Sequence, residues 1–501
     1  MTAGPSDVCG SLRLHARKRP HLAALYCGDV AVTWSALEES STNLARWFLA
    51  QGLRPGDRVA LHWSNSIEVV QLFFALFKAG LIVVTINTRL KPAEIRYILD
   101  HSDARMCFSE PALAPLAEQA GAACSVIDHL PSLERENEYS TAMPEVSCDQ
   151  PALIIYTSGT TAHPKGVVHT HRSLFHGAGN AASIYRNVEI VSRLCALPVM
   201  HMAGMTNLTG SVYQGTPIVM LPKFDPAAVL DAVERYGCSA MTCLPALTLF
   251  VVEEQARNPR DISSLRLVTA GGDAVPLALQ NRFKALFGIP LVEGYGMTEC
   301  NPVAFNPVDH PRMGSMGLPI DAVEIRIVDS DRQDLADGET GEIVIRSAAT
   351  CIGYWNDPVA TRTTVQSGWL HTGDLASRDA EGYYWFKGRK KEIIIRAGSN
   401  ISPQEVEEAL YKHPAVLEVG VVGIPDPRYG ERVVACIVLR EDQTVAAAEL
   451  RQFAQKLLAD YKLPEEILFL KQLPKSPVGK VHRRTLKEML LAHTEAAKKD
   501  S

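Results

Sequence analysis

The sequence predicts an α/β protein with a large N-terminal domain and a small, mobile α+β C-terminal domain. Apolar runs of strand length alternate with helix-length amphipathic stretches before Gly317, a pattern typical of parallel sheets covered by helices. Short alternating runs separated by turns follow, which indicates a β-rich subdomain at about 317–387. A compact mixture of helices and strands begins after Lys391. We therefore predict domains at 1–390 and 391–501, joined by a hinge because no flexible linker marks the boundary.

The composition excludes several classes of protein. The 501 residues are 47% hydrophobic and 21% charged, enough for two or more cores, and a net charge of −6 leaves no electrostatic footprint for nucleic acid. Eleven cysteines show neither a CxxC pair nor metal-ligand spacing, so reduced thiols and a cytoplasmic location are expected. The first residues do not resemble a secretory signal.

One stretch, residues 67–86, is apolar enough to be considered for a membrane. Glu68, Gln71, Lys78 and Gly80 interrupt it, and it divides more naturally into a helix that ends at Gly80 and a strand at 82–86. A soluble protein without an integral membrane segment is expected.

The first third of the chain alternates helices and strands. Ser35 and Glu38 have the spacing of a capping box before a helix that runs to Gly52. A strand at 59–63, the helix and strand just described, a helix opened by Pro92 and a strand at 105–108 follow. Residues 109–148 are predicted as helix and loop.

A polar loop follows the buried strand at 152–155. It offers backbone and hydroxyl donors to one concave anion, with Lys165 as a point charge. It is not a Walker A loop, because Pro164 precedes the lysine and Gly166 follows it. A polar surface turn is the alternative. The donors are Thr157, Ser158, Gly159, Thr160 and Thr161.

Several later strands lead into loops of small residues. A helix is predicted from Ser173, and strands at 193–198, 217–221, 241–244, 265–269 and 291–292. The last two lead into Gly271-Gly272-Asp273 and into residues 293–299, where an open α/β sheet presents ligands. Strands at 323–328, 341–346 and 383–386 form the β-rich part. The C-terminal pattern is a helix from Pro403, strands at 416–422 and 432–439, a helix at 445–460 and a basic helix after Lys480.

Five motifs in order make the chain similar to the adenylate-forming (ANL) superfamily, which includes acyl-CoA synthetases, adenylation domains of peptide synthetases and beetle luciferases. They span the loop at 157–166 together with residues 295–299, 368–374, 388–392 and 474–480. The resemblance implies two parallel sheets covered by helices, a distorted β-barrel and a mobile C-terminal domain. It implies ATP, Mg²⁺ and coenzyme A as cofactors.

The resemblance also assigns the triphosphate site. The donors at 157–161 and Lys165 would hold the β- and γ-phosphates, Thr298 would meet the α-phosphate, and Glu299 would bind Mg²⁺. Ala162 departs from the usual glycine, so its backbone has a negative φ or is strained.

For the nucleoside, the resemblance places the ribose hydroxyls on Asp374 with Arg389 nearby, and the adenine between Gly271, Gly272 and Tyr295. Asp273 departs from the small residue usual there. It would accept a hydrogen bond from the adenine amino group or cap the helix that follows.

The resemblance makes Lys480 the lysine that bridges the substrate carboxylate and the α-phosphate. Lys391 would be the hinge, and Gly398 would line the pantetheine tunnel after the small domain rotates. His201 would be the gate between the acyl pocket and the tunnel, where a packed core histidine is the alternative.

The acyl pocket is expected from residues 201–207, Gly271 and the run Gly294, Tyr295, Gly296 and Met297. Malonate-activating members carry an arginine at Gly294, and amino-acid-activating members carry an aspartate near Met202. Neither is present here, so an apolar aliphatic or aromatic monocarboxylate is predicted.

Three functions stay open. The first is an acyl-CoA synthetase, the second is an enzyme that loads a carrier-protein thiol, and the third is a nucleotide-binding protein without catalysis. Glu299, Asp374, Arg389 and Lys480 argue against the third. A luciferase-type oxygenase is more distant. A homodimer is possible.

Overall fold

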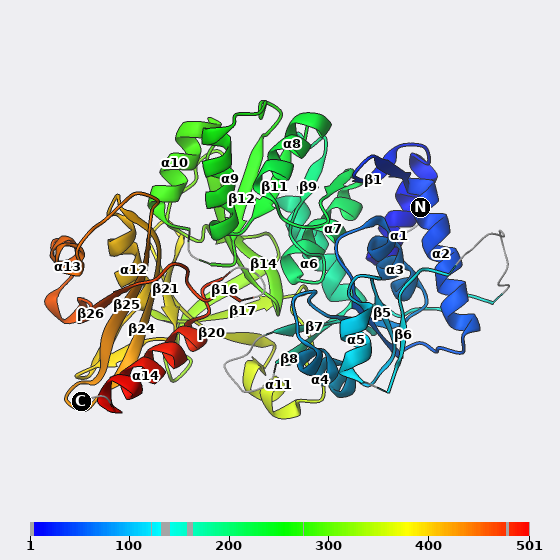
Figure 1. The fold of residues 1–501 in the computed structure, drawn as a ribbon. Helices are drawn as coiled ribbons and strands as arrows, with labels where there is room; N and C mark the ends of the chain where they lie inside the picture. The colour runs from blue at the N-terminus through cyan, green and yellow to red at the C-terminus, as the bar shows by residue number, and fades with distance from the viewer. Residues whose placement is uncertain are drawn as a thin grey trace.

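The structure is a computed structural model of the chain. It describes residues 5–121, 123–131, 141–157, 164–273, 275–476 and 480–499, with side chains up to residue 492. Figure 1 shows an elongated molecule in which the C-terminal strands and α14 lie at the end opposite to the N-terminal helices.

The first sheet has seven strands, and its centre is parallel. The order is β18-β8-β7-β4-β3-β5-β6, in which the β7–β8 and β8–β18 pairs are antiparallel and the other described pairs are parallel. The strands are β3 (Arg58–His62), β4 (Ile82–Thr85), β5 (Ala104–Ser109), β6 (Ser125–Ile127), β7 (Pro151–Thr157), β8 (Lys165–Thr170) and β18 (Gly353–Tyr354).

The second sheet has nine strands in the order β15-β14-β13-β12-β11-β9-β10-β1-β2. The run from β13 to β1 is parallel, and β14, β15 and β2 are antiparallel additions at the edges. The strands are β1 (Ala23–Cys27), β2 (Val30–Thr33), β9 (Arg193–Cys195), β10 (Ile218–Met220), β11 (Ala240–Cys243), β12 (Leu267–Gly271), β13 (Leu291–Met297), β14 (Cys300–Phe305) and β15 (Leu318–Pro319).

Helices fill the space between the sheets and cover their outer faces (Figure 1). One hydrophobic core joins side chains of both sheets, such as Leu153 and Ile218, to Phe73 of α3 and Met205 of α7. The helices are α1 (Val8–Lys18), α2 (Trp34–Ala50), α3 (Ile67–Lys78), α4 (Pro92–Ser102), α5 (Ala114–Ala120), α6 (His171–Ser183), α7 (Met202–Gln214), α8 (Pro226–Tyr236), α9 (Pro245–Arg257) and α10 (Leu277–Phe287).

A curled antiparallel sheet and a small α+β unit follow. The curled sheet contains β16 (Val323–Val328), β17 (Gly341–Ser347), β19 (Val365–Gln366), β20 (Trp369–Arg378) and β21 (Tyr384–Arg389), with α11 (Pro358–Thr364) beside it. The last unit contains β22 (Ile394–Arg396), β23 (Ser399–Ile401), β24 (Val416–Asp426), β25 (Gly430–Leu439), β26 (Glu466–Phe469), α12 (Pro403–Tyr411), α13 (Ala447–Gln455), the 3₁₀ turn η1 (Asp460–Lys462) and α14 (Arg483–Lys499). The predicted fold class is confirmed.

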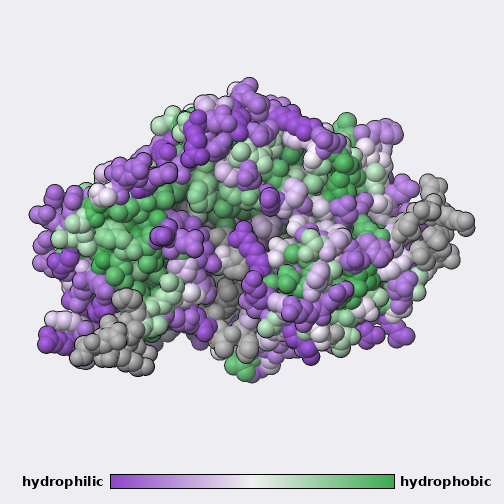
Figure 2. Space-filling model, viewed as in Figure 1, coloured by the Kyte–Doolittle hydropathy of each residue, from purple (hydrophilic) through white to green (hydrophobic). Residues whose placement is uncertain are grey.

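The surface in Figure 2 is hydrophilic over the outer helices α8 to α10, and hydrophobic residues gather over α12 and the strands of the C-terminal unit. Those strands carry a valine-rich core, with Val419, Val421 and Val433 fully or almost fully buried.

Several local predictions were wrong. The N-cap of α2 is Thr33, whose hydroxyl accepts from the amide of Ala36, while the hydroxyl of Ser35 donates to the carbonyl of Pro20. Residues 293–297 were predicted as a loop, but they continue β13 because β14 pairs with them. Strand β8 was missed, a short strand β6 lies within 109–148, and α13 is shorter than predicted.

The stretch at 67–86 forms α3 and β4, as predicted. Among the described residues, no helix is long and apolar enough to cross a membrane. Lys78, whose side chain is 4% exposed, ends α3 with its Nζ 2.8 Å from Oε2 of Glu38 and 2.8 Å from the hydroxyl of Ser41. The eleven cysteines are free.

This ion pair gives a test of the fold. Glu38→Leu leaves the ammonium of Lys78 buried without its carboxylate, so it should lower the unfolding free energy by about 2–3 kcal/mol. Adding Lys78→Met removes the buried ammonium that has lost its carboxylate partner, and it should restore much of the stability. Unfolding temperatures measured by calorimetry check the expected order of stability, in which the double variant lies between the wild type and Glu38→Leu. A double variant less stable than Glu38→Leu would contradict the account.

Candidate active site

Several of the predicted site residues meet where the nine-stranded sheet, the curled sheet and the C-terminal unit adjoin. Asp374 and Arg389 are Cα partners across β20 and β21, and Arg389 Nε lies 3.1 Å from Asp374 Oδ1. The hydroxyl of Tyr295, from β13, donates to the other oxygen of Asp374 at 2.6 Å. Burial raises the pKa of Asp374, and Arg389 opposes that shift. The carboxylate has lone pairs left to accept from ligand hydroxyls.

Lys480 reaches this junction from the C-terminal unit. Gly272 has a φ of +85°, and a Cβ added there would lie 3.5 Å from Cε and 3.6 Å from Nζ of Lys480. The backbone of Lys480 is fixed by Ser476, whose amide donates to its carbonyl at 2.7 Å. Burial lowers the pKa of Lys480, and Asp273 opposes this shift. The structure therefore brings the predicted lysine, the Gly272 turn and the Asp374 cluster together.

His201 immediately precedes α7, near the same lysine. The side-chain amide of Asn87 donates to its Nε2 at 2.7 Å, which assigns the proton of a neutral imidazole to Nδ1. Burial, followed by the charges of Lys480 and Arg89, lowers the pKa of His201 to about 4. The ring is therefore neutral at physiological pH.

The glycines of β13 are positions of close packing. A Cβ at Gly294 would lie 2.1 Å from the ring of Phe305, and one at Gly296 would lie 2.1 Å from Oδ1 of Asn301. At Gly271 it would lie 2.6 Å from the carbonyl oxygen of Gly294. Larger side chains do not fit at these positions while their neighbours stay in place.

Glu299 and Lys165 both contact the side chain of Tyr354. Glu299 is 8% exposed, and the hydroxyl of Tyr354 donates to its Oε1 at 2.7 Å. The Nζ of Lys165 lies 5.1 Å from the centroid of the same ring. Burial raises the pKa of Glu299, and in the described ranges no cationic side chain forms an ion pair with it at 4.0 Å or less. The neighbouring Thr298 accepts at its carbonyl from His169 at 2.8 Å.

The remaining predicted residues lie in several parts of the chain. Ser158, Gly159, Thr160, Thr161 and Ala162 lie outside the described residues, whereas Thr157 ends β7 opposite Lys165. Lys391 is exposed in the connection between β21 and β22. Met297 ends β13 opposite Cys300.

Two further predicted residues are Asp273 and Gly398. The capping interpretation of Asp273 was wrong, since α10 begins at Leu277 with Pro276 at its N-cap. Gly398, with a φ of +80°, and Ala397, with a φ of +49°, form the two-residue turn of the β22–β23 hairpin. Among the described heavy atoms, none lies within 4 Å of a Cβ built at Gly398.

Sequence reasoning missed the residues that support the site from other elements. Asn87 follows β4 at the carboxyl end of a parallel strand, a position that could have suggested it. Tyr354, Phe305 and Asn301 carried no such signal, because their role depends on strand pairing between distant segments.

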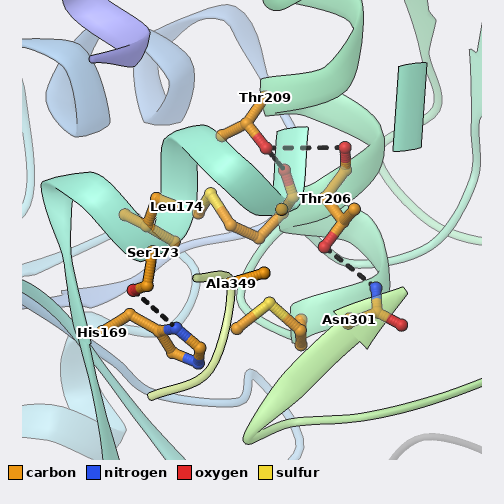
Figure 3. A pocket seen from close by; sticks show the side chains of 10 residues that line it. His169, Ser173, Leu174, Thr206, Thr209, Asn301 and Ala349 are labelled. Atoms are coloured by element: carbon orange, nitrogen blue, oxygen red, sulfur yellow. Dashed lines mark hydrogen bonds between the residues drawn. The ribbon is translucent and has the colours of Figure 1, made fainter. Parts of the chain in front are cut away.

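A cavity lies between α6 and α7 (Figure 3). It shares Met202, Met205 and Thr206 with the predicted acyl pocket. The amide of Asn301 donates to the hydroxyl of Thr206 at 2.9 Å across one wall, and Nδ1 of His169 lies 3.1 Å from the hydroxyl of Ser173 across another. The wall is therefore partly polar.

Comparisons with known proteins identify the family of the chain. The model of the AMP-binding enzyme family matches residues 12–355, and that of the AMP-binding enzyme C-terminal domain matches residues 405–480. A sulfoacetate–CoA ligase of Cupriavidus necator is 35% identical over 93% of this chain and 94% of its own. An indoleacetate–CoA ligase of Aromatoleum aromaticum is 33% identical over 96% and 97%. A fatty acid–[acyl-carrier-protein] ligase of Streptomyces coeruleorubidus is 32% identical over 95% and 94%.

Solved structures show the same arrangement. The anthranilate CoA ligase in complex with anthranoyl-AMP has a TM-score of 0.90 at 28% identity, over 98% of this chain and 99% of that one. The o-succinylbenzoate CoA synthetase of Bacillus subtilis with its acyl-adenylate has a TM-score of 0.85 at 31% identity, over 95% and 97%. The same enzyme with ATP and a magnesium ion gives 0.85 at 30%, over 95% and 99%. The resemblance to the adenylate-forming superfamily is confirmed, and the chain belongs to the family of AMP-binding enzymes.

Proposed function

We propose that this protein is an AMP-forming acyl-CoA ligase that activates an apolar aliphatic or aromatic monocarboxylate. The observation that carries the proposal is the position of Lys480, which the C-terminal unit holds against Gly272 beside Asp374. A cation at this place can meet both a carboxylate and the α-phosphate of a nucleotide whose ribose binds Asp374. Relatives that are CoA ligases support the reaction type.

In the first half-reaction, a carboxylate oxygen of the acid attacks the α-phosphorus of ATP. An acyl–phosphate bond forms, the bond between the α-phosphorus and the bridging oxygen breaks, and pyrophosphate leaves. Two anions must approach each other, so cations and donors fixed in advance lower the barrier. Lys480 would serve at the reacting carboxylate and α-phosphate, and Lys165 at the β- and γ-phosphates.

Glu299 fits a magnesium site. It is a buried carboxylate held by a phenol, without an ion-pair partner in the described part of the chain. Clusters of three or more acidic, histidine or cysteine ligands are absent among the described residues, which suits an ion that takes its other ligands from phosphates and water. Mg²⁺ bound there would neutralise charge on the triphosphate.

In the second half-reaction, the coenzyme A thiol attacks the acyl carbonyl, a thioester forms and AMP leaves. Rotation about Lys391 would withdraw Lys480 and bring the hairpin turn at Gly398 to the thiol channel. His201 would act as the gate. Its neutral ring, held by Asn87, can turn between the acyl pocket and the channel without moving a charge.

The acid is proposed to be apolar because the pocket wall at Gly294 carries no counter-charge. The ring of Phe305 occupies the space that a side chain at Gly294 would take. Methionines at 202 and 205 line the neighbouring cavity and adapt to different acyl shapes. The relatives named above act on chemically diverse acids, so they do not narrow this choice.

A carrier-protein thiol is the second candidate acceptor, favoured by the carrier-protein ligase among the relatives. A nucleotide-binding protein without catalysis is disfavoured, since Glu299, Asp374, Arg389 and Lys480 are all present.

A panel of acids tests the proposal. Pyrophosphate release should require ATP, Mg²⁺ and an acid, and coenzyme A should raise turnover. Phenylacetate, benzoate and short or medium fatty acids should react faster than malonate, sulfoacetate or any amino acid. The predicted pocket has no arginine at position 294 to pair with a second anion and no aspartate near Met202 to pair with an ammonium group. Faster turnover of a dicarboxylate would overturn the pocket assignment, and thioester formation only on a carrier protein would favour the second candidate.

Glu299→Gln tests the metal site. Removing the charge of a metal ligand should raise the Mg²⁺ concentration needed for half-maximal pyrophosphate release by at least about tenfold. Glu293→Gln is a matched control on the same hairpin, since Glu293 accepts from Gln280 at 3.0 Å and burial raises its pKa to about 8. That control should leave the metal requirement unchanged. Equal behaviour of the two variants would refute the assignment.

Lys480→Ala separates the half-reactions. It should slow formation of the acyl-adenylate by about 10²-fold or more, while thioester formation from supplied acyl-adenylate changes little. Lys391→Pro should do the reverse by fixing φ at the hinge. Lys471→Ala, an exposed lysine of the same segment, is the control. Single-turnover measurements of each step distinguish these outcomes. Equal loss of both steps in Lys480→Ala and in Lys391→Pro would exclude alternation between two domain positions.

A further inference from the structure

Tyr354 has a fixed backbone next to the predicted phosphate lysine. Its strand β18 pairs with β8, where Tyr354 is opposite Val167, and the amide of Trp355 donates to the carbonyl of Gly166 at 2.7 Å. On the other side, the amide of Tyr354 donates to the hydroxyl of Thr361 in α11 at 2.9 Å. The backbone of Tyr354 is therefore held on both sides, which fixes the point from which its phenol extends.

The hydroxyl of Tyr354 holds one oxygen of a buried carboxylate. It donates to Oε1 of Glu299 at 2.7 Å, which leaves Oε2 as the oxygen with more free lone pairs. A hydrogen bond to a ligating carboxylate fixes its orientation, and such support is worth a large part of metal affinity.

The ring of Tyr354 holds the neighbouring cation. The Nζ of Lys165 lies 5.1 Å from the ring centroid, within the range of a cation–π contact. The ammonium thus faces the ring while the carboxylate of Glu299 is bonded to the hydroxyl at its edge. Among the described ion pairs, none joins Lys165 to Glu299, although opposite charges in a buried site attract each other strongly. The phenol of Tyr354 contacts both the carboxylate of Glu299 and the ammonium of Lys165.

We infer that Tyr354 is a positioning residue that keeps Glu299 and Lys165 apart and aims each at its own ligand, the metal ion and the terminal phosphates. This inference rests on the proposed function. A direct ion pair would neutralise both groups and close the site. With each group in contact with Tyr354, the carboxylate can bind a divalent cation while the ammonium donates to phosphate oxygens.

Two variants separate the hydroxyl from the ring. Tyr354→Phe removes the hydrogen bond to Glu299 and keeps the ring against Lys165, whereas Tyr354→Leu removes both. Tyr384→Phe is the control, because the buried hydroxyl of Tyr384 donates at 3.0 Å to the carbonyl of Ile325, in the curled sheet. The control loses a buried hydroxyl bonded to backbone, so it reports a merely structural loss.

The readouts are binding measurements on the full chain. Mn²⁺ binding in the presence of a non-hydrolysable ATP analogue is followed by the electron paramagnetic resonance signal of free Mn²⁺. Binding of the analogue without metal is followed by calorimetry. Tyr354→Phe should weaken Mn²⁺ binding about tenfold or more and change metal-free analogue binding less than about twofold. Tyr354→Leu should weaken both, and Tyr384→Phe neither.

Wild-type Mn²⁺ affinity in Tyr354→Phe would overturn the inference, as would an equal loss of affinity in Tyr384→Phe. The same measurements on the wild type separate the two proposals. If the unmodified protein binds the analogue with Mn²⁺ and forms acyl-adenylate while Tyr354→Phe behaves like it, only the role of Tyr354 fails. If the unmodified protein does neither, the proposed function itself fails.

Discussion

The hydrogen bond from Tyr295 to Asp374 joins the parts on which the site depends. Tyr295 lies in the nine-stranded sheet and Asp374 in the curled sheet, so the 2.6 Å contact fixes the position of one sheet relative to the other. Arg389 binds the same carboxylate from β21, and the chain leaves the curled sheet for the C-terminal unit directly after this residue. This cluster therefore lies directly before the connection to the C-terminal unit, which places Lys480 near Gly272.

Burial sets the electrostatics around that cluster. It raises the pKa of Asp374 and Glu299 and lowers that of Lys480 and His201, so each group is less stable in its charged form than it would be in water. Ligand groups that bring the missing charges and donors offset this cost. A site of this kind gains more from a triphosphate with its metal ion than an exposed site would, because the same charges interact more strongly away from water.

The sequence predicts the sheets well, because buried parallel strands appear as short apolar runs between amphipathic helices. Prediction from the sequence fails where strand pairing overrides the local hydrophobic pattern. Gly294, Tyr295 and Gly296 have no apolar run, yet β14 turns back and pairs with them, which extends β13. Thr33 and Ser35 are both suitable caps, and in the structure the hydroxyl of Thr33 accepts from the amide of Ala36, whereas that of Ser35 donates to the carbonyl of Pro20. Within the candidate site, nothing in the local sequence indicated Tyr354, because its strand pairs with a distant segment, whereas the position of Asn87 after a parallel strand could have suggested that residue.

The wall at Gly294 shows why acid selectivity is difficult to infer from one position. The absence of an arginine there can be interpreted as a missing counter-charge for a second carboxylate. The structure adds a packing reason, because the ring of Phe305 stands 2.1 Å from where a Cβ would begin. An arginine at this position would require β14 to give up that ring. Position 294 is therefore coupled to β14 by packing, and an arginine there would require a second substitution at Phe305.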